Sequence, residues 1–227
     1  MKTTTAEEAD DVLFIVSEFP AEFKKVFEDA YYSLEKGSYV KRFPRDTPNI
    51  SRIRDNWVNF AGEMFSQMGR IRIVRWEEAL LGFIERIRDS SIDWWLTGSC
   101  ATCIRGIDIQ PHDVDIMLHS EDIAKVNTLF LDCIVEPIRS SKGWVVANFG
   151  VLFMGARIDL AFDPEGFVDS PEPADFGPYA MKNLEVVTWK GQRIKAPPLE
   201  LQRQVNRRRG RDDRVAAIEQ YTINRSC

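Results

Sequence analysis

Two aspartates alternate with apolar residues in the segment Asp113-Val114-Asp115-Ile116-Met117-Leu118. The apolar residues of this short segment predict a buried strand, and alternate residues of a strand point to the same face. Asp113 and Asp115 would therefore lie side by side, and their repulsion raises at least one pKa unless a cation lies between them. A divalent metal removes this conflict, and Mg²⁺ prefers carboxylate and phosphate oxygens. The segment therefore predicts a magnesium site at a strand.

Two further segments carry polar groups next to predicted strands. Gly98-Ser99 follows the apolar stretch 92–97, so we expect a strand that enters a turn and a short helix. Backbone N–H groups and a hydroxyl at such a turn can hold a phosphate. Asp159 lies in a strand-like stretch, where it could accept a proton or complete a second metal site. Asp163 competes for this role, but apolar residues flank Asp159 on both sides.

The remaining sequence alternates between helical and strand-like patterns. Helical spacing of apolar residues over 23–31 and 57–65 predicts that the first seventy residues are mainly helical, and the same spacing predicts a further helix at 76–87. Prolines in 43–50 and in 163–178 predict loops. The other expected elements are strands at 114–118, 144–149, 151–154 and 157–162, a helix at 121–131, a hairpin at 184–195, and helices at 199–209 and 212–223.

These elements predict an α+β fold, a mixed β-sheet core flanked by helices with a helical N-terminal extension. We divide the chain into a helical region at 1–74, a core at 75–196 and C-terminal helices at 197–227 that pack on the core.

Composition restricts the class of protein. The chain has 30 Lys and Arg against 35 Asp and Glu, a net charge of −5 that gives no support to a general nucleic-acid or membrane coat. We expect no transmembrane helix, no secretory signal, and a cytoplasmic protein with reduced thiols. We interpret Cys100 and Cys103 as core residues, because a structural zinc site would need two further ligands.

In order, these segments resemble the nucleotidyltransferase superfamily that includes the polymerase β type. That family has a hydrophobic residue before Gly-[Gly/Ser], then Asp-h-[Asp/Glu]-h, then h-[Asp/Glu]-h, where h is hydrophobic. The matching segments are Leu96 to Ser99, Asp113 to Ile116 and Ile158 to Leu160. Arg105-Gly106 and Pro111-His112 make the chain look most similar to the lincosamide and aminoglycoside nucleotidyltransferases.

The resemblance implies a nucleotidyltransferase-type core that binds Mg²⁺ at Asp113, Asp115 and Asp159, which are also the expected catalytic residues. It implies nucleotide contacts from Gly98, Ser99, Arg105 and His112. The alternatives are that His112 makes a loop hydrogen bond and that Arg105 points away from the site.

A basic segment near the C-terminus supplies further candidates for phosphate binding. Residues 190–214 contain nine basic residues against three acids. On a helix, Arg203, Arg207 and Arg211 would form a stripe at i, i+4 spacing, unless Gly210 breaks it. Guanidinium groups bind phosphate oxygens well, so we expect Arg207 and Arg211 to reach the nucleotide. The alternative is a solvated basic face, or pairing with Asp212, Asp213 and the acidic loop 163–175.

The predicted activity is Mg²⁺-dependent transfer of AMP from ATP to the hydroxyl of a small acceptor such as an antibiotic, without a membrane partner. Two alternatives stay open. The acceptor could be tRNA or a protein, as in toxin-like enzymes, although the acidic net charge counts mildly against RNA. The chain could also be an inactive nucleotide-binding module, although buried acids without a cation repel each other.

Overall fold

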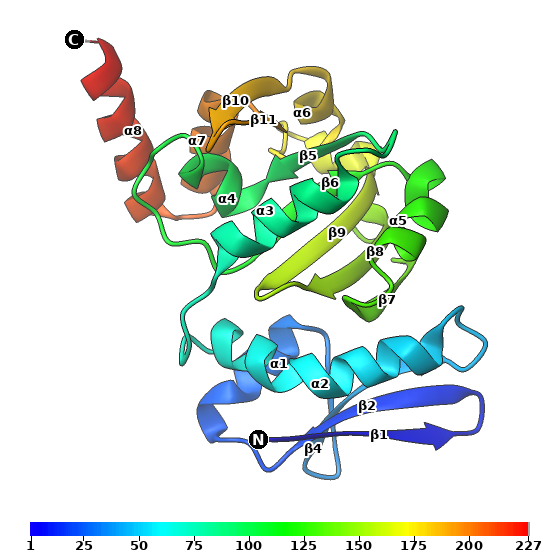
Figure 1. The fold of residues 1–227 in the computed structure, drawn as a ribbon. Helices are drawn as coiled ribbons and strands as arrows, with labels where there is room; N and C mark the ends of the chain where they lie inside the picture. The colour runs from blue at the N-terminus through cyan, green and yellow to red at the C-terminus, as the bar shows by residue number, and fades with distance from the viewer. Residues whose placement is uncertain (227) are drawn as a thin grey trace.

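A five-stranded mixed sheet forms the centre of the molecule (Figure 1). This computed structural model describes residues 1–226. The strand order is β5 (Trp94–Thr97), β6 (Val114–Leu118), β9 (Arg157–Pro164), β8 (Val146–Phe153) and β7 (Ile134–Ser140). β6 and β9 run parallel, and the other neighbours are antiparallel. The predicted α+β class with a mixed sheet is therefore confirmed.

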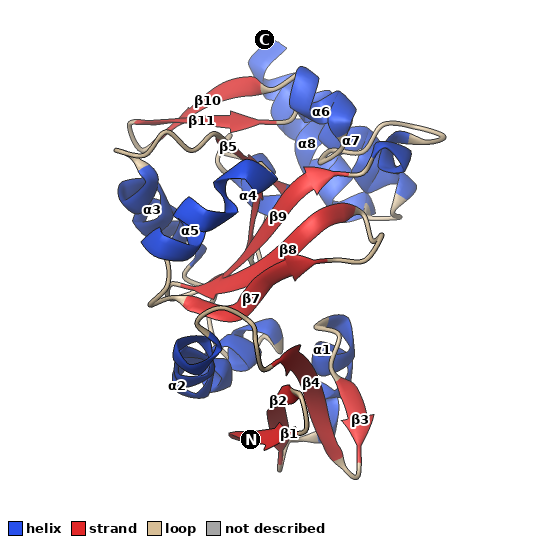
Figure 2. Cartoon of the chain, turned by 90° about the vertical axis from the view of Figure 1, so that its right-hand side faces the viewer, coloured by secondary structure: helices blue, strands red, loops and turns tan. Residues whose placement is uncertain are grey.

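Helices cover this sheet. α3 (Trp76–Ile87) and α5 (Ile123–Leu129) lie on one side of it, as Figure 2 shows. α3 buries an apolar face that includes Ala79, Leu80 and Phe83. The short helix α4 (Gly98–Cys103) follows β5 directly. These helices lie where the apolar spacing predicts them.

The first seventy residues contain a sheet that the sequence analysis did not predict. β1 (Lys2–Glu8), β2 (Asp11–Ser17), β4 (Ser38–Pro44) and β3 (Ser33–Glu35) form an antiparallel sheet in that order. The prediction of a helical N-terminal region was therefore wrong for these strands. β1 is polar and mostly exposed, so it has no apolar alternation, and its pairing with β2 is what makes it a strand.

The hairpin of β3 and β4 has a local cause that the sequence does contain. Glu35 pairs with Ser38 across the turn Lys36-Gly37, and both turn residues have positive φ. A two-residue turn with two positive φ angles matches the twist of a hairpin, and glycine adopts it without steric cost.

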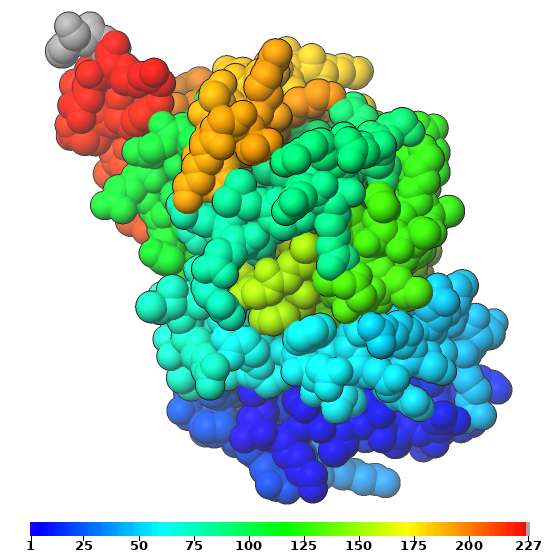
Figure 3. Space-filling model, in the orientation of Figure 1, coloured from blue at the N-terminus to red at the C-terminus, as the bar shows by residue number. Residues whose placement is uncertain are grey.

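The two predicted N-terminal helices are present beside this sheet. They are α1 (Lys24–Asp29) and α2 (Ile50–Met68). α2 lies between the N-terminal sheet and the central sheet, and the space-filling view shows these parts in direct contact (Figure 3). One continuous buried cluster includes Phe14 of β2, Trp57 of α2 and Ile158 of β9.

The second half of the chain follows the prediction with two differences. β7 was not predicted, and the two short strands expected at 144–149 and 151–154 are the single strand β8. The predicted hairpin and C-terminal helices are confirmed. The elements are α6 (Pro178–Lys182), β10 (Glu185–Trp189), β11 (Gln192–Ala196), α7 (Leu199–Arg208) and α8 (Asp212–Ser226), with 3-10 turns at Ala21–Phe23, Ser120–Asp122 and Gly166–Asp169.

Among residues 1–226, no helix has both the length and the apolar character that a membrane span requires. Cys100, Cys103 and Cys133 are free thiols, and Cys227 lies outside the described residues.

A buried ion pair joins the N-terminal sheet to the central sheet. Lys41 Nζ of β4 lies 2.5 Å from Glu136 Oε2 of β7, and their side chains are only 11% and 2% exposed. Tyr32 donates a second hydrogen bond to Glu136 (3.2 Å), and Trp57 donates to the Tyr32 hydroxyl (2.9 Å). Burial lowers the pKa of Lys41, while Glu136 acts in the opposite direction. Each of these two buried charges is therefore stabilised by the other instead of by water.

We predict that Glu136→Ala lowers the free energy of unfolding by about 3 to 5 kcal/mol, because it leaves Lys41 buried and unpaired. Urea denaturation followed by circular dichroism measures this change. The matched control is the double variant Lys41→Met/Glu136→Leu, which removes both charges and should lose much less. Equal losses in the two proteins would show that packing, not charge pairing, stabilises this contact.

Candidate active site

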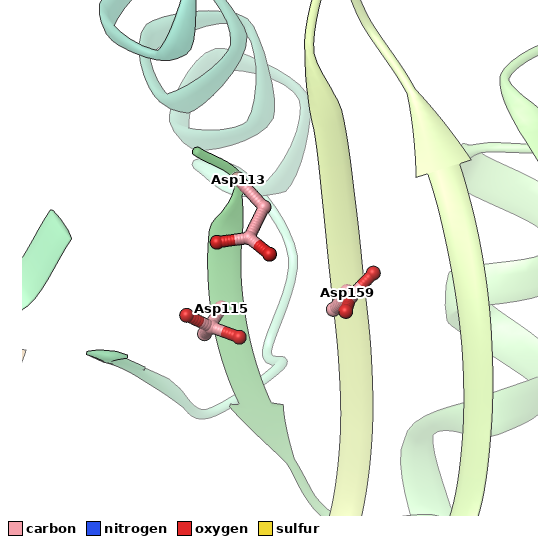
Figure 4. A group of neighbouring side chains, drawn as sticks. All are labelled: Asp113, Asp115 and Asp159. Carbon is pink, nitrogen blue, oxygen red and sulfur yellow. The ribbon is translucent and has the colours of Figure 1, made fainter. Parts of the chain in front are cut away.

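The carboxylates of Asp113, Asp115 and Asp159 come together on two adjacent strands of the central sheet (Figure 4). One ligand oxygen from each lies within 4.8 Å of the others. Asp113 immediately precedes β6, Asp115 is in β6, and Asp159 is in the neighbouring β9. The three expected acids therefore form one cluster, whereas Asp163 binds Ser120 N (3.1 Å) instead.

Strand register explains why these residues meet. Asp115 pairs with Thr97 of β5 on one side and with Asp159 of β9 on the other. Cross-strand partners share a sheet face, so Asp115 and Asp159 must project together. Asp113 lies two residues before Asp115 and projects to the same face.

Burial and neighbouring carboxylates raise the pKa values of Asp113 and Asp115. Burial, together with the nearby Asp159 carboxylate, raises the pKa of Asp113 to about 6, against 3.8 ordinarily. Burial raises the pKa of Asp115 well above its usual range, and Asp113 and Asp159 add to this effect. The cluster thus has an excess of negative charge that a cation would neutralise.

Arg157, which carries no motif in the sequence, partly neutralises this charge. Its guanidinium binds Asp159 through Nε (2.5 Å to Oδ1) and through one terminal nitrogen (3.2 Å to Oδ2). The side chain is 10% exposed, and its other terminal nitrogen lies 3.5 Å from Met68 Sδ of α2. A two-point contact of this kind fixes the plane of the Asp159 carboxylate.

Gly98 is required by close approach of the chain to Asp115. Its φ is +64°, and a Cβ built there would lie 1.9 Å from Asp115 Oδ2. From the other side, Gln202 Nε2 of α7 donates to the Gly98 carbonyl (3.0 Å). The C-terminal helix α7 therefore holds the Gly98-Ser99 turn against the acid pair.

A cavity of about 450 Å³ opens over these residues. Gly98, Ser99, His112 and the three acids line it, together with three arginines, Arg209, Arg211 and Arg214. Among the described residues, none of these arginines is in an ion pair of the kind that Arg207 makes with Glu219 (2.7 Å). Burial and the neighbouring guanidinium groups lower the pKa of Arg211.

Of the other residues predicted to bind the nucleotide, His112 and Arg211 line the cavity, whereas Arg105 and Arg207 do not. His112 lines the cavity beside Arg70 (3.2 Å), and burial lowers its pKa. Arg105 donates to the Pro197 carbonyl (2.8 Å) and pairs with Glu185 (2.9 Å), away from the cavity. Arg207 is not in the lining either. Gly210, with φ +63°, ends the helical stripe, so Arg209 and Arg211 lie at the cavity instead.

A fourth carboxylate, Asp175, also lines the cavity and was not predicted. It is 4% exposed, and burial raises its pKa while Arg209 and Arg211 oppose that shift. Its backbone carbonyl accepts a hydrogen bond from Thr97 (2.9 Å). Its position in a proline-rich loop gave no periodic signal, so only the folded chain reveals it.

The donor set of the three acids fits a hard divalent cation. Hard cations such as Mg²⁺ take carboxylate oxygens and keep several waters. No other group of three potential ligand side chains comes together in residues 1–226. Cys100 is instead fully buried, and its thiol donates to the Asp113 carbonyl (3.1 Å), in agreement with a core role.

No family model and no curated protein sequence matches the chain. Several solved structures are similar to it. A candidate nucleotidyltransferase from Thermotoga maritima is 20% identical with a TM-score of 0.47, and the match covers 64% of this chain and 91% of that one.

A lincosamide antibiotic adenylyltransferase with bound lincomycin is 14% identical with a TM-score of 0.41, over 58% of this chain and 85% of that one. An antigenic nucleotidyltransferase-like protein from Paracoccidioides brasiliensis is 18% identical with a TM-score of 0.40, over 64% and 77%. All three are named as nucleotidyltransferases, adenylyltransferases or proteins like them.

We predict that Gly98→Ala displaces Asp115 and weakens Mg²⁺ binding at least tenfold, measured by isothermal titration calorimetry. The matched control is Gly106→Ala, because Gly106 has φ +88° with nothing within 4 Å of its would-be Cβ. Both variants pay the cost of a left-handed alanine, about 1 to 2 kcal/mol, but only Gly98→Ala also collides with Asp115. Equal Mg²⁺ affinities in the two variants would contradict the steric role of Gly98.

The raised pKa of Asp113 predicts a pH-dependent stability in the presence of a chelator. Because the folded pKa of about 6 exceeds the ordinary 3.8, the folded state binds the proton more tightly, and stability falls as pH rises through this window. Asp113→Asn should therefore stabilise the metal-free protein by roughly 2 to 3 kcal/mol above pH 6 and hardly at all near pH 4.

Urea denaturation at both pH values tests this prediction, with Asp159→Asn as the contrasting variant. That substitution leaves the buried Arg157 unpaired, so it should destabilise the protein at neutral pH. A loss of stability in Asp113→Asn at neutral pH would contradict the proposed repulsion.

Proposed function

We propose that this protein is a Mg²⁺-dependent nucleotidyltransferase that moves AMP from ATP to the hydroxyl of a small acceptor. The observation that carries the proposal is the convergence of Asp113, Asp115 and Asp159 in a cavity that also contains unpaired arginines. A magnesium–nucleotide complex is bound by oxygen ligands, which hold the cation, and by guanidinium groups, which hold the phosphates.

The chain's own residues divide the work. Asp113 and Asp115 would hold the cation, which when bound supplies neutralisation of the triphosphate charge. Ser99 and the arginines Arg209, Arg211 and Arg214 would hold phosphate oxygens and stabilise the leaving pyrophosphate. Gln202 and Gly98 position the turn that faces these groups.

Asp159 is the proposed proton acceptor. The acceptor oxygen would form a bond to the α-phosphorus while the bond to the β-phosphate oxygen breaks, and the hydroxyl proton would pass to Asp159. Arg157 would keep the Asp159 carboxylate in one plane during this step. Pyrophosphate leaves with the electron pair of the broken bond.

We predict that Asp115→Asn and Asp159→Asn each lower the rate of transfer at least about a hundredfold, because each loses a charge that the reaction needs. The measurement is transfer of radiolabel from α-labelled ATP to acceptor pools of small hydroxylated compounds, tRNA and protein. Asp163→Asn, on the same strand but outside the cluster, should retain activity. Full activity of either Asp115→Asn or Asp159→Asn would refute the assignment.

A further inference from the structure

A second cavity, of about 360 Å³, lies between the N-terminal sheet and the edge of the central sheet. Its lining combines Tyr31, Lys41 and Phe43 from the N-terminal sheet region with β7, β8 and the loop between them. Trp144 and Phe149 line this cavity and the catalytic cavity alike. We call it the Trp144 cavity.

Strand register places the Trp144 cavity beside the proposed proton acceptor. Phe149 of β8 pairs with Ala161 of β9, and Val151 pairs with Asp159 two residues away. Residues two apart on a strand share a face, so the Phe149 ring projects from the same face as Asp159. The two cavities therefore meet at Phe149, on the face of the sheet from which Asp159 projects.

Two large rings are exposed at the rim of this cavity. Tyr31 is 64% exposed and Trp144 is 40% exposed, although rings of this size are usually covered. Their centroids lie 5.7 Å apart, and Trp144 is 5.6 Å from Phe149. Tyr31 comes from the N-terminal region and Trp144 from the β7–β8 loop, so the rim exists only when both parts are folded together.

The charge of the lining is positive. It contains Lys41, Arg139 and Lys142 against the single acid Glu136, which is already paired with Lys41. Arg139 lies over the Phe43 ring (4.7 Å) and donates one hydrogen bond to a backbone carbonyl (3.3 Å). Within residues 1–226, neither Arg139 nor Lys142 is in an ion pair. Two cations therefore remain available to a ligand.

We propose that the Trp144 cavity binds the acceptor, and that the acceptor is a small hydroxylated compound with an anionic group such as a phosphate. This inference rests on the proposed nucleotidyl transfer, because it names the substrate of that site. Arg139 and Lys142 bind the anion, the Tyr31 and Trp144 rings cover the body of the compound, and its hydroxyl reaches Asp159. The volume suits a small molecule, and the positive lining disfavours a polycationic acceptor such as an aminoglycoside.

The test uses the full-length protein with ATP, Mg²⁺ and acceptors in matched pairs, ribose 5-phosphate against ribose and glucose 6-phosphate against glucose. Lincomycin and kanamycin serve as the neutral and polycationic alternatives. We expect transfer to the phosphorylated member of at least one pair at about tenfold or greater efficiency, since a hydrogen bond to a charged group is typically worth that factor. Preferred transfer to kanamycin, lincomycin or the unphosphorylated sugars would overturn the proposal.

Variants then locate the site. Arg139→Ala, Lys142→Ala and Tyr31→Ala should each raise the KM for the phosphorylated acceptor about tenfold and leave the KM for ATP unchanged. Lys24→Ala is the matched control, because it removes an exposed lysine of the N-terminal region that does not line the cavity. Unchanged acceptor KM values in all three variants would overturn the assignment of this cavity.

A binding measurement separates failure of this inference from failure of the proposed function. Calorimetry with ribose 5-phosphate and glucose 6-phosphate is done with a non-hydrolysable ATP analogue and Mg²⁺ present, so that the catalytic cavity is filled. Binding that Arg139→Ala weakens, without any transfer, would support the cavity and contradict the enzyme reaction. Transfer to other acceptors, without binding of either sugar phosphate, would contradict the cavity alone.

Discussion

The constraint on which this structure depends is the repulsion among three aspartates on adjacent strands. Asp115 and Asp159 are cross-strand partners, so the register that forms the sheet also forces their charges together. The fold compensates only in part, through the contact of Arg157 with Asp159. Asp113 and Asp115 keep raised pKa values. The remaining repulsion destabilises the folded state, so a cation that binds the three acids stabilises the protein. The stability of the fold is therefore linked to the cation binding that the proposed function needs.

Sequence periodicity predicted most of the central fold and the acid cluster, because both depend on local patterns. Alternation in β6 and β9 determines the face on which Asp115 and Asp159 lie, and Gly98 marks the turn beside them. The contact of Arg157 with Asp159 could not be predicted, although the two residues are only two positions apart, because a lone arginine in a strand forms no pattern. The choice of Arg207 rested on the helical spacing of Arg203, Arg207 and Arg211, which Gly210 breaks.

The N-terminal sheet was missed for a different physical reason. Its outer strand β1 is polar and exposed, so only pairing with β2 identifies it. The buried contacts of Lys41 and Tyr32 with Glu136 join residues about a hundred positions apart, as their separations of 95 and 104 show. Such contacts depend on tertiary structure, and no periodicity in the sequence reports them.

The N-terminal region covers an edge of the central sheet that would otherwise be exposed. β7 is the last strand of the central sheet, and an exposed edge strand invites pairing with other chains. α2 packs against β7, and Asn56 Nδ2 donates to the Leu131 and Ile134 carbonyls (2.8 and 2.9 Å). The N-terminal sheet region and the edge of the central sheet also line one cavity between them. This is the Trp144 cavity, so protection of the edge also creates a place for a second substrate beside Asp159.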